Sequence, residues 1–208
     1  MAFNAFRDLG AIIQDLKIIY QEGDFLEPVP FVLSEYFRED LRLTLADGLV
    51  ENSEVAICEN LVYPVLKEVW KAYRSHFLIW SQQFLHSTES FDAFPEYIIA
   101  SRSPLGKVVF DQPYLIVVEA KQDNFNSGWC QCLLEMMVAD RINGGEPFTV
   151  FGVVTNGELW QFGKLEKQQF TRQRYFYRLQ NLDELSAVLN FIFQSCENQL
   201  KSQQPVSV

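Results

Sequence analysis

The segment Tyr114-Leu-Ile-Val-Val-Glu-Ala-Lys121 predicts a buried β-strand that ends in charged residues. Because successive side chains of a strand point to opposite faces, Glu119 and Lys121 project to the same side, and Val118 and Ala120 pack behind them. A charge at the end of so apolar a strand is costly to leave unpaired. The segment alone leaves two interpretations open, an ion pair at a strand end and a pair of functional residues.

The segments on either side of this strand alternate between helix and sheet patterns. Further strands are predicted over residues 96–101, 107–110, 148–155, 158–165 and 170–179, and helices over 11–20, 53–69, 127–141 and 182–200. Gln112-Pro113 predicts a turn before the central strand, and Asn156-Gly157 favours a type I′ hairpin turn. Pro64 predicts a kink in the second helix. We therefore expect an α/β fold with a mixed sheet flanked by helices.

Length and composition indicate a single folding unit. The chain has 208 residues, of which 48% are hydrophobic and 21% charged, and this ordinary globular composition excludes disordered and low-complexity proteins. Residues 1–50 are predicted to form a helical N-terminal cover, 51–200 the core, and 201–208 a frayed tail.

The chain is acidic, with 17 basic and 27 acidic residues and a net charge of −10. Its averaged field repels nucleic acid and anionic membranes, so a polyanion would have to meet a local basic patch. No apolar run approaches the roughly 20 residues of a membrane helix, and the first residues lack a secretion signal. We expect a cytoplasmic protein without a membrane partner. Its four irregularly spaced cysteines favour reduced, mostly buried thiols.

A basic stretch over residues 161–180 could supply that patch, since it carries +4 while the rest of the chain carries −14. Its cations, the expected nucleic-acid contacts, are Lys164, Lys167, Arg172, Arg174 and Arg178. The aromatic residues among them are Phe170, Tyr175, Phe176 and Tyr177. These aromatic side chains fit a strand that sends them into the core somewhat better than a base-stacking groove, whereas the charge favours the groove.

A second acidic residue precedes the central strand. Glu96 follows Pro95 and opens a predicted strand 23 residues before Glu119. This Pro-acid, spacer, Glu-x-Lys arrangement resembles the active-site signature of the PD-(D/E)XK nuclease superfamily. The resemblance implies that Glu96 and Glu119 hold a divalent cation, usually magnesium, and that Lys121 acts on the attacking water. The carbonyl of Ala120 would be a natural third ligand, because hard oxygen ligands suit magnesium.

Two further segments extend the resemblance to roughly residues 53–165. Ser53-Glu54 followed by Leu61-Val-Tyr-Pro-Val-Leu66 resembles the helix before the site in the N-terminal nuclease domain of type I restriction R subunits. The segment Val153-Val-Thr-Asn-Gly-Glu-Leu-Trp-Gln-Phe162 resembles the hairpin that those domains carry after the site. The resemblance implies a restriction-endonuclease-like fold.

The chain also departs from the family pattern. Glu96 stands where the pattern has aspartate, and the extra methylene either shifts the metal or marks a weakened site. Gln131 matches a helix glutamine of some relatives, but Glu135 replaces the tyrosine that follows it there. Gln131 is therefore either a site residue or a polar residue at a helix start. Glu54 is either a site residue or a favourable charge at a helix N-terminus.

Other chemistries find little support in the sequence. Cys130 and Cys132 point to nearly opposite sides of a predicted helix and cannot jointly bind zinc, and His76 and His86 need no catalytic explanation. We expect a magnesium-dependent nuclease that hydrolyses phosphodiester bonds of DNA, for which manganese could replace magnesium and two copies could pair as a homodimer. Two alternatives stay open. One is a catalytically silent domain that binds nucleic acid or a protein partner, and the other is a hydrolase of a different phosphate ester.

Overall fold

The computed structural model describes residues 8–86, 92–144 and 147–203. The helices are α1 (Leu9–Leu16), α2 (Glu35–Asp47), α3 (Glu54–Ile57), α4 (Tyr63–Tyr73), α5 (Phe125–Ile142) and α6 (Leu182–Gln203). The strands are β1 (Ile19–Gly23), β2 (Phe77–Ser81), β3 (Leu85–His86), β4 (Asp92–Ala93), β5 (Tyr97–Arg102), β6 (Phe110–Ala120), β7 (Thr149–Thr155), β8 (Leu159–Glu166), β9 (Gln169–Gln173) and β10 (Tyr177–Arg178).

One mixed eight-stranded sheet organises the fold, as expected for an α/β domain. Its strand order is β1-β9-β8-β7-β6-β5-β2, and β10 pairs with β8. The pairs β6/β7 and β1/β9 are parallel, and the other pairs of this sheet are antiparallel. The parallel pair β6/β7 requires a crossover, which α5 supplies.

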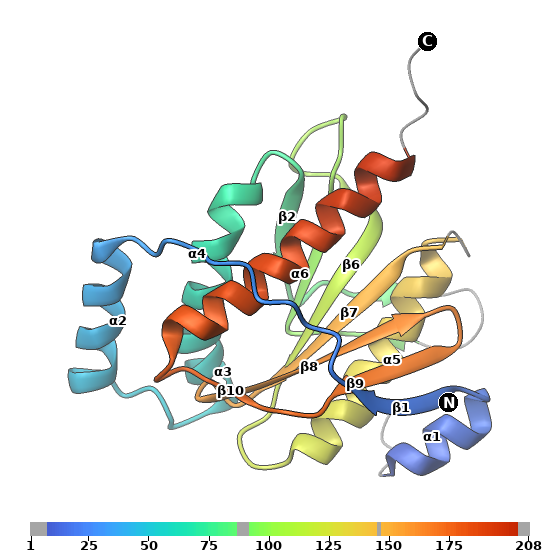
Figure 1. Ribbon diagram of the computed structural model, residues 1–208, viewed down its shortest axis with the longest axis horizontal. Helices are drawn as coiled ribbons and strands as arrows, with labels where there is room; N and C mark the ends of the chain where they lie inside the picture. The colour runs from blue at the N-terminus through green and yellow to red at the C-terminus, as the bar shows by residue number, and fades with distance from the viewer. Residues whose placement is uncertain (1–7, 87–91, 145–146, 204–208) are drawn as a thin grey trace.

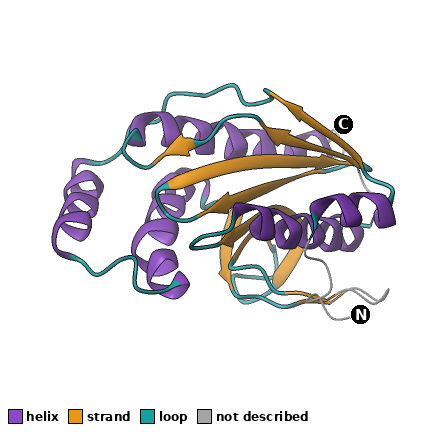
Figure 2. Cartoon of the chain, turned by 90° about the horizontal axis from the view of Figure 1, so that it is seen from below, coloured by secondary structure: helices purple, strands orange, loops and turns teal. Residues whose placement is uncertain are grey.

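Helices cover both faces of this sheet. In Figure 1, α6 crosses in front of the strands and α5 lies behind them, and Figure 2 shows the strands between helical layers. Val118 and Phe151 belong to the core under α4 and α6, whereas Val117, Trp129 and Val154 belong to the core under α5. The central strand β6 is therefore buried on both sides. All four cysteines are buried and unpaired, which confirms the expectation for the thiols.

The N-terminal region differs from its predicted helix over residues 11–20. Helix α1 ends at Leu16, because Lys17 adopts a left-handed backbone conformation with φ of 54°. Residues 19–23 then form β1, which pairs in parallel with β9 along the edge of the sheet. The prediction was wrong for Ile19 and Tyr20. Residues 1–50 thus include a sheet strand as well as the helix α2, which Ser34 caps.

The helix predicted from Ser53 onward begins where expected and changes type in its middle. The Ser53 hydroxyl accepts a hydrogen bond from Ala56 N at 3.1 Å, so Ser53 is the N-cap. A π-helical segment, Cys58–Val62, separates α3 from α4 and places Pro64 in the first turn of α4. Proline is tolerated in a first turn because its missing N–H group needs no partner there. At the position of the predicted kink, the helix changes from π-helical to α-helical.

Three local predictions are corrected around the central strand. The strand predicted over 107–110 is wrong, because residues 107–109 form a turn and a bend and Phe110 is the first residue of β6. Gln112-Pro113 does not end a strand, because β6 runs through it and only its register with β5 shifts nearby. Helix α5 begins at Phe125 rather than Ser127, since Asn124 Oδ1 accepts a hydrogen bond from Ser127 N at 3.0 Å and caps the helix.

Two further corrections concern the C-terminal half. The turn between β7 and β8 has three residues, of which only Gly157 has a positive φ, 89°, so it is not a type I′ turn. The predicted strand over 170–179 is broken into β9 and β10 by an exposed loop at residues 174–176. Residues 201–203 belong to α6, and 204–208 lie outside the described residues.

Candidate active site

The charged pair predicted at the end of β6 is formed in the structure. Glu119 is fully buried, and Lys121 Nζ lies 2.8 Å from its Oε1 atom. The backbone N–H of Lys121 donates to Thr155 O at 2.9 Å, which extends the pairing of β6 with β7 past the last strand residue. Glu119 faces the α5 side, because Val117, two residues earlier, packs in that core. The site therefore lies between the sheet and the start of α5.

Glu96 lies immediately before β5, the antiparallel neighbour of β6. Tyr97 pairs with Val118, so the register places Glu96 next in line toward Glu119. The Glu96 carbonyl accepts a hydrogen bond from Gln82 N at 2.9 Å, and its Oε2 accepts one from Gln82 Nε2 at 3.5 Å. Glu96 is half-buried, and its charge raises the pKa of Glu119. Two predicted site acids are thus neighbours across two strands.

Burial dominates the electrostatics of Glu119. It raises the pKa of the carboxyl to about 7, and the charges of Glu96 and Glu54 act in the same direction against the opposing effect of Lys121. For Lys121, burial lowers the pKa, but the neighbouring carboxylates of Glu119, Glu54 and Glu96 together outweigh burial and the pKa is raised overall. Glu119 Oε2 has no hydrogen-bond partner among the described residues. A buried carboxylate oxygen in this condition is poorly stabilised by the protein alone.

Glu54 joins the same cluster from the first turn of α3. Its Oε2 lies 3.6 Å from Lys121 Nζ, and its Oε1 accepts a hydrogen bond from Gln122 N at 3.4 Å. Lys121 is therefore held between Glu119 and Glu54. Ser53 fixes the start of α3, so the Ser-Glu pair of the sequence has a structural role as an N-cap followed by a site carboxylate.

Gln131 hydrogen-bonds to Glu135, which the sequence identifies only as a departure from the family pattern and not as a site residue. Its Nε2 donates to Glu135 Oε1 at 3.2 Å, one helical turn along α5. Glu135 is 1% exposed, and burial followed by the charge of Glu119 raises its pKa well above the usual range. An acid flanked by Leu133-Leu134 and Met136-Met137 on a sheet-facing helix was the signal that could have indicated Glu135.

The donor chemistry of this cluster suits a hard divalent cation. Carboxylate and carbonyl oxygens are preferred by magnesium, which usually keeps several waters and binds only one or two carboxylates. Glu96, Glu119 and the Ala120 carbonyl would supply that number, and the unpartnered Oε2 of Glu119 is a free oxygen donor. Within the described ranges, no three His, Cys, Asp or Glu side chains gather closely enough to hold a metal ion. The protein ligands would therefore be few.

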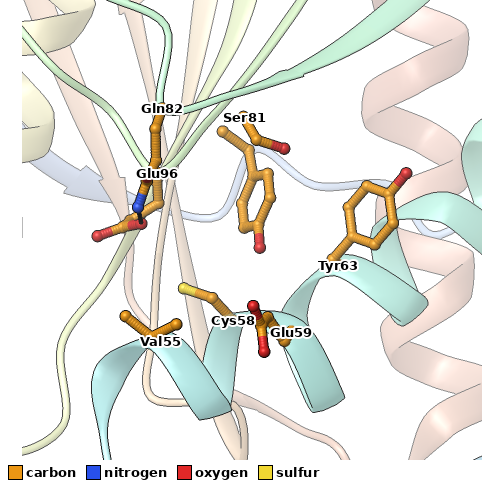
Figure 3. A pocket seen from close by; sticks show the side chains of 8 residues that line it. Val55, Cys58, Glu59, Tyr63, Ser81, Gln82 and Glu96 are labelled. Atoms are coloured by element: carbon orange, nitrogen blue, oxygen red, sulfur yellow. Dashed lines mark hydrogen bonds between the residues drawn. The ribbon is translucent and has the colours of Figure 1, made fainter.

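Two hollows flank the charged cluster. The first has a volume of about 310 Å³ and is shown in Figure 3, where Glu96 and Gln82 lie together opposite Cys58 and Glu59 of the π-helical segment. Tyr97 also lines it. The second has a volume of about 220 Å³. Its lining residues are Glu51, Ile57, Gln122, Asp123, Asn156 and Glu158. Glu96 lines the first hollow, Gln122, the residue after Lys121, lines the second, and both hollows carry carboxylates.

The basic stretch does not form one continuous row of free cations. Lys164 pairs with Glu166 at 2.7 Å, and Arg172 pairs with Glu22 at 2.7 Å. Lys167 lies in the turn between β8 and β9, at the sheet end where β7 begins.

Arg174 and Arg178 lie at the other end of the sheet. Arg178 pairs with Leu159 on β8. The next residue of β8, Trp160, pairs with Thr155, and Thr155 pairs with Ala120 at the end of β6. Arg174 and Arg178 are both exposed. Two of the five predicted contacts therefore lie at the end of the sheet that carries the candidate site.

Comparison with known proteins adds no assignment: no family model matches this chain, and no curated protein matches it. Among the described residues, no helix has the length and apolar character needed to span a bilayer.

Proposed function

We propose that this chain is a magnesium-dependent nuclease that hydrolyses phosphodiester bonds of DNA. The observation that carries the proposal is the fully buried Glu119, with Lys121 Nζ at 2.8 Å and an Oε2 atom that has no partner among the described residues. A carboxylate with a strongly perturbed pKa that is paired with a lysine beside a hollow is typical of catalytic centres. The order Pro-Glu96, Glu119, Lys121 and its resemblance to the PD-(D/E)XK superfamily support the same reaction class.

Each residue has a distinct role in this proposal. Glu96, Glu119 and the Ala120 carbonyl would hold the ion, which when bound neutralises charge on the phosphate and lowers the pKa of a bound water. Manganese would serve with the same ligands. Lys121 stabilises negative charge on the attacking oxygen, because its ammonium group is fixed near Glu119 and cannot turn away freely. Glu54 positions Lys121 from the opposite side.

A catalytically silent domain that binds nucleic acid or a protein partner is the second candidate. The observation that favours it is Glu96, which is one methylene longer than the expected aspartate and hydrogen-bonds to Gln82. A longer, otherwise engaged carboxylate would place an ion less accurately. The two candidates differ in whether DNA is cleaved.

Cleavage of supercoiled plasmid and of single-stranded DNA, with magnesium, with manganese and with EDTA, tests the proposal. We expect metal-dependent cleavage that falls by about 100-fold or more in Lys121→Ala, as is usual when an electrostatic stabiliser of the transition state is removed. Lys107→Ala is the matched control, since Lys107 is an exposed lysine in the turn between β5 and β6, at the opposite end of these strands. Thermal melting verifies that each variant is folded.

The outcomes separate the candidates. Wild-type cleavage in Lys121→Ala removes Lys121 from the mechanism and refutes the proposed site. DNA binding by the wild-type protein without cleavage in either metal supports the silent domain. Cleavage that EDTA does not stop contradicts the metal dependence.

A further inference from the structure

The loop between β9 and β10 exposes two aromatic side chains next to a cation. Tyr175 is 58% exposed and Phe176 is 46% exposed, and Arg174 before them is also exposed. The other two aromatic residues of the basic stretch are placed differently, since Phe170 is fully buried and Tyr177 packs edge-on against a core ring. The structure thus divides these aromatics into two core residues and two surface residues.

This loop contacts the part of α5 that supports the catalytic lysine. The rings of Phe176 and Phe125 pack edge to face, with centroids 5.1 Å apart. Phe125 opens α5, and Gly128 lies one turn later, a rise of about 5 Å along the helix. A Cβ atom at Gly128 would lie 3.2 Å from Lys121 Cγ, so the aliphatic part of the lysine side chain packs against the helix at this glycine. In Figure 1 the connection from β9 to β10 passes through the lower part of the view, just above the first turn of α5.

Buried hydrogen bonds hold the base of the loop in place. Gln161 Nε2 donates to Gln173 O at 3.0 Å, and Gln161 Oε1 accepts from Trp129 Nε1 at 2.6 Å. Gln173 Oε1 accepts a further bond from Phe25 N at 3.2 Å. Gln161, Gln173 and Trp129 are all buried. The loop is therefore presented from a fixed support, which lowers the entropy cost of binding a ligand.

We propose that Tyr175 and Phe176 form a stacking surface for unpaired nucleobases at the rim of the candidate active site. This inference rests on the proposed function, because it names the form of nucleic acid that the site accepts. Flat exposed rings beside an arginine match the faces of bases, and those faces are accessible only in a single strand or a frayed end. Arg174 and Arg178 make no salt bridge among the described residues, so they remain able to contact the phosphates between stacked bases.

The charge of the surroundings also favours a single strand. The hollow beside Lys121 carries Glu51, Asp123 and Glu158, so the site end of the sheet repels a dense double row of phosphates. Two exposed arginines provide few contacts against that repulsion. Base stacking does not depend on phosphate density, and it can anchor a flexible strand next to Lys121.

Binding measurements on two matched DNA forms test this inference. We would measure the affinity of a fluorescent 15-nucleotide single strand and of the corresponding duplex, with calcium in place of magnesium, over a range of salt concentrations. We expect the double substitution Tyr175→Ala, Phe176→Ala to weaken single-strand binding by about tenfold or more and duplex binding by less than about twofold. The slope of log affinity against log salt stays unchanged, because no cation is lost.

The controls address folding and non-specific aromatic contact. Tyr175→Ala alone leaves the Phe176–Phe125 contact intact and should still weaken single-strand binding, whereas Tyr175→Phe keeps a flat ring and should retain it. Tyr36→Ala removes a tyrosine that is 79% exposed on α2 and should change neither affinity. Arg174→Ala should instead lower the salt slope by about one unit for either DNA form.

The inference and the proposed function fail in different ways. The stacking surface is overturned if the double variant loses single-strand and duplex binding equally, or if its single-strand binding is unchanged. Plasmid cleavage that depends on Lys121 would still support the nuclease in either case. Conversely, stacking-dependent binding without cleavage supports the surface and contradicts the nuclease. A wild-type protein that binds no single strand overturns the inference and favours a protein partner for this loop.

Discussion

Replacing Glu119 with glutamine should stabilise the metal-free protein at neutral and alkaline pH. Glutamine has nearly the same shape as glutamate and carries no charge. The substitution therefore removes the free-energy cost of burying the Glu119 carboxylate, which Lys121 offsets only in part. The same substitution should abolish cleavage, because it removes a metal ligand in the proposed mechanism. Stability and activity should therefore change in opposite directions.

The size of the effect follows from the pKa of Glu119. Burial raises this pKa from its ordinary 4.5 to about 7, and one pH unit corresponds to ~1.36 kcal/mol of differential stability. The folded state binds the proton more tightly than the unfolded state. The free energy of unfolding is therefore highest, with respect to this group, below pH 4.5, where Glu119 is protonated in both states. It falls as the pH rises toward 7 and is lower by about 3 kcal/mol above that pH. Glu119→Gln should not show this fall.

Urea unfolding in EDTA at half-unit steps from pH 4.5 to 8 measures the difference. The gap between Glu119→Gln and wild type should widen by about 3 kcal/mol across this range and level off above pH 7. Glu166→Gln serves as a control of opposite sign, because hydrogen bonding from Lys164 lowers the pKa of Glu166 and no stabilisation at pH 8 is expected. A difference in the free energy of unfolding that does not change with pH would refute the conclusion that burial raises the pKa of Glu119.

Two further substitutions probe the placement of the ion and of the lysine. If the longer side chain of Glu96 only weakens ion placement, Glu96→Asp should raise the cleavage rate or lower the magnesium concentration for half-maximal activity, as measured by metal titration; unchanged values would separate Glu96 from the metal. Gly128→Ala would place a Cβ 2.6 Å from Val154 Cγ1 and 3.2 Å from Lys121 Cγ, so it should displace Lys121 and lower the free energy of unfolding by about 1–3 kcal/mol through overpacking. Urea unfolding measures this cost, and full stability with full activity would contradict the close packing.

The main features of the site were predictable because they depend on local periodicity. A strand has a repeat of two, so Glu119 and Lys121 had to share a face, and the 2.8 Å contact between them confirms it. Ser53 was predictable as an N-cap because a serine hydroxyl satisfies an exposed N–H at the start of a helix. The mixed sheet followed from the order of the elements. The first two signals each involve residues within a few positions of one another along the chain.

Features that depend on contacts between distant segments were not predictable. The apolar neighbours of Glu135 on α5 could have indicated a buried acid, but only the packing of that helix on the sheet shows that the charge of Glu119 acts on its carboxyl. The alternation around Arg174 suggested a continuous strand, whereas the structure ends β9 at Gln173. Ile19 and Tyr20 continue the apolar spacing of a helix in the sequence, and only their parallel pairing with β9, about 150 residues later, makes them part of a strand.

The buried carboxylates are difficult to explain by stability alone. Glu119 and Glu135 each have a raised pKa, and Glu54 and Glu96 add further negative charge around one lysine. Replacement of a whole buried ion pair by neutral groups of similar volume is often neutral or stabilising, so folding alone gives no reason to bury the Glu119–Lys121 pair. Charge retained at such a cost is typical of sites where binding or chemistry requires it. A divalent cation would supply the missing positive charge without a second lysine, and the proposed nuclease activity gives that cation a use.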